Sequence, residues 1–277
     1  MRINNNITAL NTFNKYTKNT EASSKAMEKL SSGFRINRAA DDAAGLSISE
    51  KMRSQIAGLD QSGRNVEDGI SYIQTAEGAL EEVSDMLVRM KELAVEASNG
   101  TYSGTDLENI QAEIDQLANA INEVSTTTKF NGINVFSSDT TISYGANAGE
   151  SVTVAEASDF TDLAAKNGVA GATADGALVA IDVETAAAAA VTTIEGAIDI
   201  VNTQRATYGA QQNKLTHISN NLSTTNENIS AAESNIRDVD MASEMSEYTK
   251  DNILVQAATA MLAQANAMPQ NVLSLLQ

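Results

Sequence analysis

The sequence of 277 residues contains no cysteine and no tryptophan, one proline (Pro269) and one histidine (His217). Without cysteine the chain has no disulfide framework, no thiolate metal site and no cysteine nucleophile. A lone histidine, with no second ligand at suitable spacing, indicates a surface or interface residue rather than a metal site. The sequence therefore predicts no catalytic residue, no metal and no cofactor, and we expect the protein not to be an enzyme.

Aromatic residues make up only 4% of the chain, and long apolar runs are missing. Each aromatic ring buries a large area, so their scarcity favours helices that pack through Leu, Ile, Val and Ala. No stretch approaches the 18 apolar residues of a membrane-spanning helix, so no membrane partner is expected. The start, "MRINNNITAL", lacks the apolar segment of a cleaved signal peptide. If the protein is exported, we expect its N-terminus to be kept.

The charge is strongly negative but uneven along the chain. Residues 1–64 hold ten Lys/Arg and six Asp/Glu, a net charge of +4, whereas the remainder holds eight basic and thirty acidic residues, a net charge of -22. The basic residues are spaced along a helix and lack the dense stripe of a nucleic-acid footprint, so no nucleic-acid partner is expected. Subunits of this charge repel one another, so self-assembly should depend on salt.

Helical periodicity dominates the first half of the chain. A first apolar stripe ends at "SSG" (31–33), and a second continues to about Ala97, where "SNGTYSG" (98–104) reads as a loop. A third helix follows, with Thr105 or Asp106 as its expected cap and two seams of seven-residue spacing. The first stripe consists of Ile3, Ile7, Leu10, Phe13, Tyr16, Met27 and Leu30.

The middle of the chain changes character at Phe130. "FNGINVF" carries an Asn-Gly turn, and the alternating stretches "TISY" and "SVTV" flank "GANAGE", which predicts a β-hairpin. Residues 156–183 are small and rich in Gly and Ala, and they carry no recognisable motif.

The second half returns to helix. A long helix is expected from about Thr185, and another with its seam at Met241, Tyr248, Val255 and Leu262. Pro269 should kink or restart the latter. The long helix is marked by seven residues at heptad spacing, namely Ile194, Val201, Tyr208, Leu215, Leu222, Ile229 and Ile236.

These patterns predict a mainly α fold, an elongated antiparallel helical bundle or coiled coil made by the N- and C-terminal segments, with a small β-hairpin region in the middle. The terminal stripes are too narrow to fold alone, so they should pair with each other and leave apolar surface for other copies of the chain. We expect residues 1–30 and 245–277 to be disordered in the monomer and helical in the polymer. The expected self-assembly core is Ile3, Ile7, Leu10, Val255, Leu262, Val272, Leu273, Leu275 and Leu276.

Long motifs near both ends resemble bacterial flagellin. In the N-terminal half these are "LSSGFRINRAADDAAGLSISEKMRSQIAGL" (30–59), "GISYIQTAEGALEEVSDMLVRMKELAVEA" (69–97) and "TKFNGINVF" (128–136). Near the C-terminus they are "AESNIRDVDMASEM" (232–245) and "ILVQAATAMLAQANAMPQNVLSLLQ" (253–277). The resemblance covers roughly residues 1–155 and 180–277.

The resemblance implies a domain organisation. It assigns residues 1–34 and 243–277 to a terminal-helix filament-core domain, and residues 35–155 and 180–242 to a helical rod domain with the β-hairpin. Residues 156–179 form a short variable insert, which implies a short flagellin without large outer domains.

Two charged groups are candidate sites. Arg35, Arg38, Asp41 and Asp42 lie between two glycines without any accompanying nucleophile, which favours a joint held by Arg–carboxylate contacts over an active site. In flagellins this stretch links core and rod. Separately, Arg89, Leu93 and Glu113 match a flagellin face that is buried between neighbouring subunits and recognised by a vertebrate Toll-like receptor. As a plain helix face, Leu93 would pack and Arg89 would face water.

The function implied is a structural subunit that self-assembles into the helical, extracellular flagellar filament used for motility. Its implied partners are copies of itself, a flagellar export chaperone and the type III export gate, and the filament cap and hook-junction proteins. Two alternatives stay open on the sequence alone. A hook–filament junction protein shares similar terminal helices, and a secreted coiled-coil adhesin would carry its function in the insert.

Overall fold

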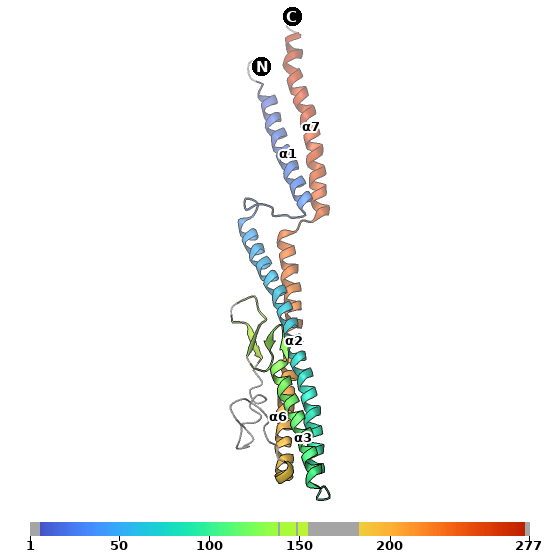
Figure 1. Cartoon of the computed structure of the whole chain (residues 1–277). Coiled ribbons are helices and arrows are strands. Elements are labelled where there is room, and N and C mark those ends of the chain that lie inside the picture. Colours follow the sequence, from blue (N-terminus) through green and yellow to red (C-terminus); the bar gives the residue numbers. More distant parts are fainter. Residues whose placement is uncertain (1–5, 138, 148, 155–182, 275–277) are drawn as a thin grey trace. The chain divides into compact units, whose positions relative to one another are not determined.

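Five helices make up most of the part of the chain that the structure describes, which is residues 6–137, 139–147, 149–154 and 183–274 of a computed structural model (Figure 1). Side chains are described from residue 187 in the fourth helix and to residue 268 in the fifth. The helices confirm the predicted mainly α fold. They are α1 (Ile7–Ser32), α2 (Ala43–Ala97), α3 (Gly104–Thr127), α6 (Val183–Arg237) and α7 (Met241–Ser274).

The chain divides into two units. The first combines residues 1–56 with 227–277, and the second is residues 57–226. Helices α2 and α6 run through both units. The first unit includes the segment after α1, whose Arg35 N–H donates to the Arg237 carbonyl (2.7 Å), and the start of α2, whose Ser49 contacts Arg237 (3.4 Å). The predicted core-domain boundaries at residues 34/35 and 242/243 stay a prediction.

The second unit has one continuous apolar core to which α2, α3 and α6 all contribute. The heptad positions of α6 from Ile194 to Leu215 are fully buried, as the seven-residue spacing predicted. They meet an equally buried stripe of α2 that includes Leu80 and Leu87. Leu, Ile, Val and Ala supply most of this core, in keeping with the scarcity of aromatic residues.

Helix α3 starts at Gly104, two or three residues earlier than the predicted cap at Thr105 or Asp106 implies. Ser103 is the N-cap, and its backbone N–H (3.1 Å) and Oγ (2.7 Å) both donate to Asp106 Oδ2. These bonds hold the pKa of Asp106 below its usual value. The prediction of Thr105 or Asp106 as the N-cap was therefore wrong. Asp106 is the third residue of the helix, and its side chain accepts the bonds that complete the capping box with Ser103.

Two short antiparallel hairpins lie between α3 and α6. Strands β1 (Lys129–Phe130) and β2 (Ile133–Asn134) are joined by the predicted Asn-Gly turn, and Asn131 has a positive φ of 50°. Strands β3 (Thr140–Ser143) and β4 (Ser151–Val154) confirm the predicted hairpin, with Ile142 opposite Val152. The side chains of Ile142, Val152 and Val154 point into the core of the second unit, which fixes the register.

In the first unit, α1 and α7 pack against each other as an antiparallel pair (Figure 1). Lys29 Nζ lies 3.4 Å from Glu244 Oε1 at one end, and Asn6 Nδ2 donates to the Ala265 carbonyl (2.8 Å) at the other. The predicted pairing of the two chain ends is confirmed. The buried apolar residues of the contact are small, namely Ala26, Ala258 and Ala265.

One expectation for the ends differs from the structure. Residues 7–30 and 245–274 are helical, and the alanine seam lets these two helices approach closely and bury their shared face. The expected disorder of the ends in the free monomer stays a prediction. The backbone of α7 also stays helical through Pro269 to Ser274, so the helix is not restarted there. Among the described residues, no helix combines the length and apolarity that crossing a membrane requires.

Candidate assembly surface

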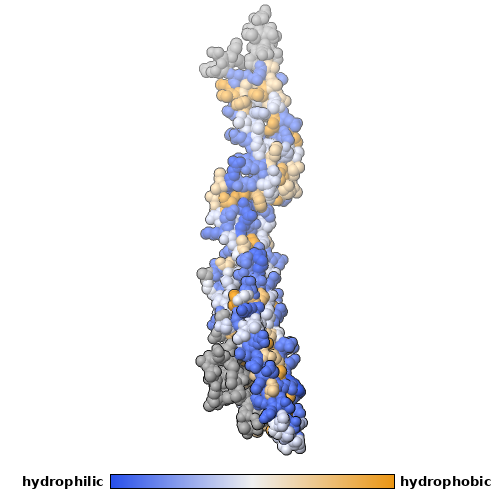
Figure 2. Space-filling view, in the orientation of Figure 1, coloured by the Kyte–Doolittle hydropathy of each residue, from blue (hydrophilic) through white to orange (hydrophobic). Residues whose placement is uncertain are grey.

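Most of the large exposed apolar side chains among the described residues lie on α1 and α7. On α1 they are Ile7, Leu10 and Phe13 near the N-terminal end, and Met27 further along. Figure 2 shows apolar residues exposed over this helix pair. Side chains of this size normally cover a core, so their exposure on both helices marks a surface for interaction. On α7 they are Met241, Met245, Ile253, Leu254, Met261 and Met268.

The surface of α7 is also poor in charge. After Asp251 the sequence has no Asp, Glu, Lys or Arg. The described exposed positions beyond it carry only apolar side chains, Thr, Asn or Gln. A helix that is apolar or neutral on all sides is usually buried on all sides. Helix α1 covers only one side of α7, so the rest of α7 is suited to contact further protein.

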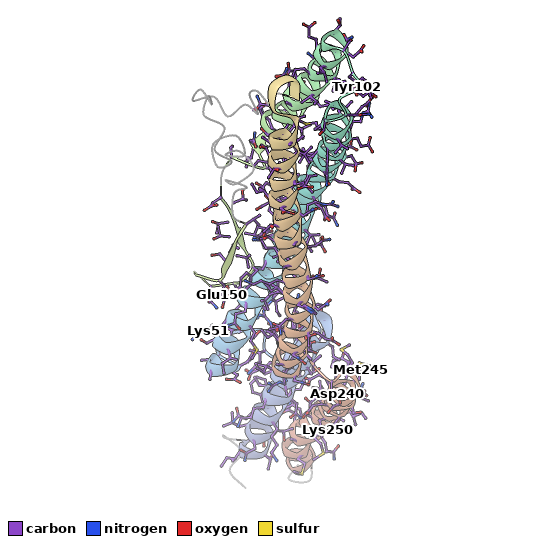
Figure 3. The ribbon with its side chains drawn as sticks, turned by 90° about the horizontal axis from the view of Figure 1, so that it is seen from below. Lys51, Tyr102, Glu150, Asp240, Met245 and Lys250 are labelled. Atoms are coloured by element: carbon purple, nitrogen blue, oxygen red, sulfur yellow. The ribbon has the colours of Figure 1, made fainter. Side chains whose placement is uncertain are left out.

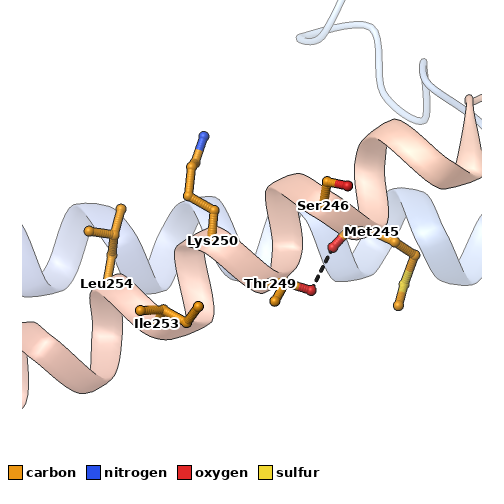
Figure 4. Close-up of a pocket in the computed structure, with 6 residues that line it drawn as sticks. All are labelled: Met245, Ser246, Thr249, Lys250, Ile253 and Leu254. Atoms are coloured by element: carbon orange, nitrogen blue, oxygen red, sulfur yellow. Dashed lines mark hydrogen bonds between the residues drawn. The ribbon is translucent and has the colours of Figure 1, made fainter.

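A shallow groove runs along the first turns of α7. It is lined by Met245, Ser246, Thr249, Lys250, Ile253 and Leu254 (Figure 4). Thr249 Oγ1 donates to the Met245 carbonyl (2.8 Å) and so turns its polar atom back to its own helix. Asp240 caps this end of the helix by accepting from the Ala242 N–H (3.0 Å), and Asp240, Met245 and Lys250 are seen together in Figure 3.

The predicted assembly residues fall on two sides of the helix pair. Ile7 and Leu10 are more than 60% exposed and lie on the outer surface. Val255 and Leu262 are half-buried and share a face of α7 with the buried Ala258. The other five lie where side chains are not described, namely Ile3, Val272, Leu273, Leu275 and Leu276.

Sequence reasoning missed the exposed residues of α7, such as Ile253 and Met261. Heptad counting selected the seam that packs inside the subunit, because only that seam has a regular period. The signal for the outer face was different, namely the absence of charge after Asp251 on every side of the helix. The exposed face was therefore detectable from charge, and not from periodicity.

Backbone hydrogen bonds join the end of α1 to the end of α6. Gly33 ends α1 with a left-handed φ of 76°, a conformation that glycine adopts at no steric cost, and its N–H donates to the Lys29 carbonyl (2.9 Å). The Arg35 N–H donates to the Arg237 carbonyl (2.7 Å), and the Val239 N–H donates to the Gly33 carbonyl (3.0 Å). The exposed Arg35 side chain also donates to the Ile236 carbonyl (2.6 Å).

Arg237 is the central side chain of this joint, and the sequence analysis did not select it. Its guanidinium contacts Glu50 Oε1 at 2.6 Å and Ser49 Oγ at 3.4 Å, both on α2. The same group lies over the Phe34 ring, 4.9 Å from the centroid. The side chain is only 13% exposed. Arg237 therefore connects α6, α2 and the segment after α1.

The other three predicted joint residues act through local partners. Arg38 forms a two-pronged ion pair with Glu28 (2.9 and 3.2 Å). Asp41 Oδ2 accepts from the N–H groups of Arg38 (3.0 Å) and Asn37 (3.3 Å), and the Arg38 bond chiefly lowers the pKa of Asp41. Asp42 Oδ1 accepts from the Gly45 N–H (2.9 Å) at the start of α2.

Gly45 is required by close packing. A β-carbon there would collide with the side chains of Asp42 and the buried Ile36.

The carboxylates of Asp41 and Asp42 organise the backbone of the turn that leads into α2. The carboxylate that pairs with Arg38 comes instead from α1.

The third predicted group, Arg89, Leu93 and Glu113, contains two exposed residues and one buried residue. Arg89 Nε and one terminal nitrogen contact Glu113 Oε1 at 3.0 and 2.9 Å, and the other terminal nitrogen contacts Glu92 at 3.3 Å. These bonds, above all those that Arg89 donates to Glu113, raise the pKa of Arg89. Leu93 is 2% exposed and belongs to the core of the second unit. In the subunit, Arg89 and Glu113 are therefore at the surface and Leu93 is not.

His217 lies exposed on α6, as expected for a surface residue. Within the residues that the structure describes, no three His, Asp or Glu side chains are grouped as metal ligands would be.

Comparison with known families matches both helical ends of the chain. Residues 3–141 match the bacterial flagellin N-terminal helical region, and residues 191–276 match the bacterial flagellin C-terminal helical region. The chain belongs to the bacterial flagellin family. These matches include all three candidate groups of residues and the joint residue Arg237.

Full-length relatives agree with this assignment. The flagellin of Bacillus subtilis strain 168 is 49% identical over 309 aligned positions, and the alignment covers all of both chains. The flagellar filament 33 kDa core protein of Treponema phagedenis is 44% identical, again over all of both chains. A crystal structure of Bacillus cereus flagellin is 30% identical, with a TM-score of 0.47, and covers 61% of this chain and 94% of that one.

This flagellin is therefore a structural subunit of the flagellar filament, which is extracellular. Flagellins are a structural protein family that self-assembles into that filament. The full-length matches do not favour the hook–filament junction protein or the adhesin that the sequence alone left open.

Proposed function

We propose that the exposed faces of α1 and α7 are the surfaces through which subunits contact one another at the centre of the filament. The support is the concentration of exposed apolar side chains on these two helices and the absence of charge after Asp251. Burying side chains such as Ile7, Leu10 and Ile253 is worth roughly 1.5–3 kcal/mol each before ordering costs. In this proposal Ile3, Ile7, Leu10, Val272, Leu273, Leu275 and Leu276 are part of the same contact, while Val255 and Leu262 support it from within the subunit.

The two faces are chemically different, which suits open polymerisation. Helix α1 carries the exposed cations Lys15, Lys18 and Lys25, whereas α7 is neutral beyond Asp251. A surface that does not match itself forms a head-to-tail contact, and repetition of such a contact gives a helical filament rather than a closed dimer. We assign residues 1–34 and 243–277 to the filament core, residues 35–155 and 180–242 to the rod, and residues 156–179 to a short insert.

We further propose that Arg35, Arg38, Asp41, Asp42 and Arg237 hold the joint between core and rod. Their contacts connect the end of α1 to α2 and to the end of α6 within the first unit. Two backbone hydrogen bonds, from Arg35 to Arg237 and from Val239 to Gly33, connect the segment after α1 to the end of α6. Such a joint fixes where α1 ends and where α7 begins, so that the two antiparallel helices are in register for their pairing.

The partners implied by export and growth follow from the same exposed faces. A free subunit with this much exposed apolar surface is at risk of early association, so a chaperone that covers α7 before export is expected. We propose the flagellar export chaperone, the type III export gate, the filament cap and the hook-junction proteins as partners, with motility as the role of the filament.

For the second unit we propose that the surface around Arg89 and Glu113 is a contact between neighbouring subunits and is available to a Toll-like receptor on free subunits. Their ion pair presents a fixed, charged surface. Leu93 would support that surface from the core rather than touch the partner.

The assembly proposal is tested by Ile253→Glu, with Ile133→Glu as the matched control. Both isoleucines are exposed, but Ile133 lies on strand β2 of the second unit. A carboxylate buried without a partner is strongly unfavourable, so Ile253→Glu should raise the critical concentration for seeded growth more than about tenfold. Ile133→Glu should leave it unchanged. Filaments would be scored by electron microscopy after heat dissociation, cooling and seeding.

Unimpaired growth of the Ile253→Glu variant would exclude the α7 face as an assembly contact. Circular dichroism of both variants must first match that of the unmodified chain, so that a folding defect is not mistaken for loss of contact. Removal of residues 273–277 tests the terminal leucines in the same assay, and unaided growth of that truncated chain would remove them from the proposal.

A further inference from the structure

The exposed methionines have an unusual distribution. The chain has nine methionines, and all the described ones that are strongly exposed lie on α1 or α7. The described methionines elsewhere are buried, as Met90 is, or half-buried, as Met52 and Met86 are. Four of the six large exposed apolar residues of α7 are methionine. The exposed set is Met27 (52%), Met241 (49%), Met245 (50%), Met261 (62%) and Met268 (45%).

A thioether has a reactivity that Leu and Ile lack. A peroxide transfers one oxygen atom to the sulfur, the O–O bond breaks, and the other oxygen leaves as water. The sulfur is oxidised by two electrons to the sulfoxide while the peroxide is reduced. The chain contains no cysteine, so thioethers are its only sulfur groups. Exposure decides which of them react, and that selects the methionines of α1 and α7.

We propose that the methionines of α7, chiefly Met245, Met261 and Met268, form a peroxide-reactive modification site whose oxidation blocks assembly of the free subunit. The proposal rests on the α7 face being the assembly contact. Met245 lines the groove beside Ile253 and Leu254, and its side chain extends from the helix surface in Figure 4. A sulfoxide there introduces a strong hydrogen-bond acceptor where a neighbouring subunit must exclude water.

The neutral surroundings make that acceptor unfavourable on burial. Beyond Asp251 the face of α7 offers no charged side chain as a hydrogen-bond donor, and Lys250 is already paired with Glu247 (2.7 Å). Burying a hydrogen-bonding group without a partner weakens a contact enough to raise the critical concentration about tenfold for each sulfoxide. Once a subunit is assembled its methionines are covered, so the filament is protected and only the free subunit is sensitive.

The experiment compares three chains before and after treatment with hydrogen peroxide, which catalase then removes. They are the unmodified chain, an α7 variant with all four exposed methionines of that helix, Met241, Met245, Met261 and Met268, changed to Leu, and a control with Met86 and Met90 changed to Leu. Leucine keeps the apolar volume and cannot be oxidised. Seeded growth is measured by electron microscopy and light scattering, and peptide mass spectrometry locates each added oxygen.

We expect peroxide to raise the critical concentration of the unmodified and control chains more than about tenfold and to leave that of the α7 variant nearly unchanged. Methionine sulfoxide reductase should restore growth of the oxidised chain that carries no substitution. This measurement tests the proposal without any mutation. The same peroxide dose applied to finished filaments should leave the α7 methionines unmodified.

Two results would overturn the inference: normal growth of the oxidised unmodified chain with sulfoxide located on α7, or equal loss of growth in the α7 variant. Growth of the Ile253→Glu variant without peroxide distinguishes a failure of the modification proposal from a failure of the assembly proposal. If Ile253→Glu grows normally, the contact itself is wrongly placed. If Ile253→Glu fails while the oxidised chain grows, only the modification site is wrong.

Discussion

At the scale of single residues, Arg237 shows how one side chain can join segments far apart in the sequence. Its planar guanidinium bonds Glu50 and Ser49 while lying over the Phe34 ring. Lysine would place a single charge at such a site, but it could not contact carboxylate, hydroxyl and ring with the same geometry. The Nε of Arg237 is buried without a hydrogen-bond partner, so the other contacts of this side chain must offset the free-energy cost of burying that group.

Replacing Arg237 by Met should destabilise the joint by about 1–3 kcal/mol, because a charge-assisted hydrogen bond and a cation–π contact are lost from a site that is mostly buried. Amide exchange of the Arg35 and Val239 N–H groups, which bond across the joint, would report the loss. Arg53→Met, at an exposed position of α2, is the control and should change stability by less than about 0.5 kcal/mol. Equal exchange in the two variants would contradict the role of Arg237.

Asp41 gives the joint a predictable acid response. Hydrogen bonds from the N–H groups of Arg38 and Asn37 lower its pKa from the ordinary value of 3.8. Its stabilising contribution is thus fully present above pH 3.8 and is lost as the pH falls through the lower folded pKa. Exchange of the Arg38 N–H should accelerate in that acid range. The step should disappear in Asp41→Asn, and its persistence there would assign the response to another group.

At the scale of elements, the pairing of α1 with α7 depends on small side chains. Ala26, Ala258 and Ala265 are the buried apolar residues of the described contact, and the larger apolar residues of both helices are half-buried or exposed. The pair therefore buries little apolar area for its length. Elements held by so few buried contacts open more readily than a continuous core such as that of the second unit.

Ala258→Leu tests this seam directly. The larger side chain must separate the helices, at a cost of about 1–3 kcal/mol to their pairing. Amide exchange throughout α1 and α7 should accelerate, while exchange in α3 stays unchanged. Ala257→Leu, one residue earlier and exposed, is the matched control and should exchange like the unmodified chain. Slow exchange in Ala258→Leu would mean that the helices are held together by something other than the alanine seam.

At the scale of the whole molecule, the net charge of -18 opposes assembly while the apolar surface of α1 and α7 favours it. The acidic residues lie mainly beyond residue 64, and the terminal helix α7 is neutral after Asp251. This distribution keeps most of the negative charge away from the surface proposed for contact. Electrostatic repulsion then sets how much apolar burial is needed before a filament grows.

Seeded assembly should therefore become easier with salt. Raising ionic strength from about 0.01 M to about 0.1 M shortens the screening length from about 30 Å to about 10 Å, which weakens the repulsion between subunits. The critical concentration should fall severalfold over that range, measured by sedimentation of filaments. A sucrose series of equal osmolality controls for solute effects. A critical concentration that rises with salt would show that attraction between charges drives the contact.

Local sequence pattern was enough to find most elements of the fold. The heptads of α6 and the alternation of β3 and β4 were read correctly, because burial on one face imposes a period that the sequence must keep. The cap of α3 was misplaced by two or three residues, since Ser, Thr and Asp are all acceptable caps and only the backbone decides among them. The ion-pair partner of Arg38 was also missed. Glu28 lies ten residues earlier, within α1, and the end of that helix and the following turn separate the two residues in the sequence.

The sequence by itself determined the family, the helical class and the antiparallel return of the chain, because long motifs and repeated apolar spacings are properties of the chain alone. The tertiary structure decided which side of α7 faces α1 and which side, with Met245, Ile253 and Met261, stays uncovered. It also decided that Arg237 binds at the joint while Leu93 is withdrawn into the core. These outcomes depend on which helices meet and at what rotation, and residues more than a hundred positions apart set both.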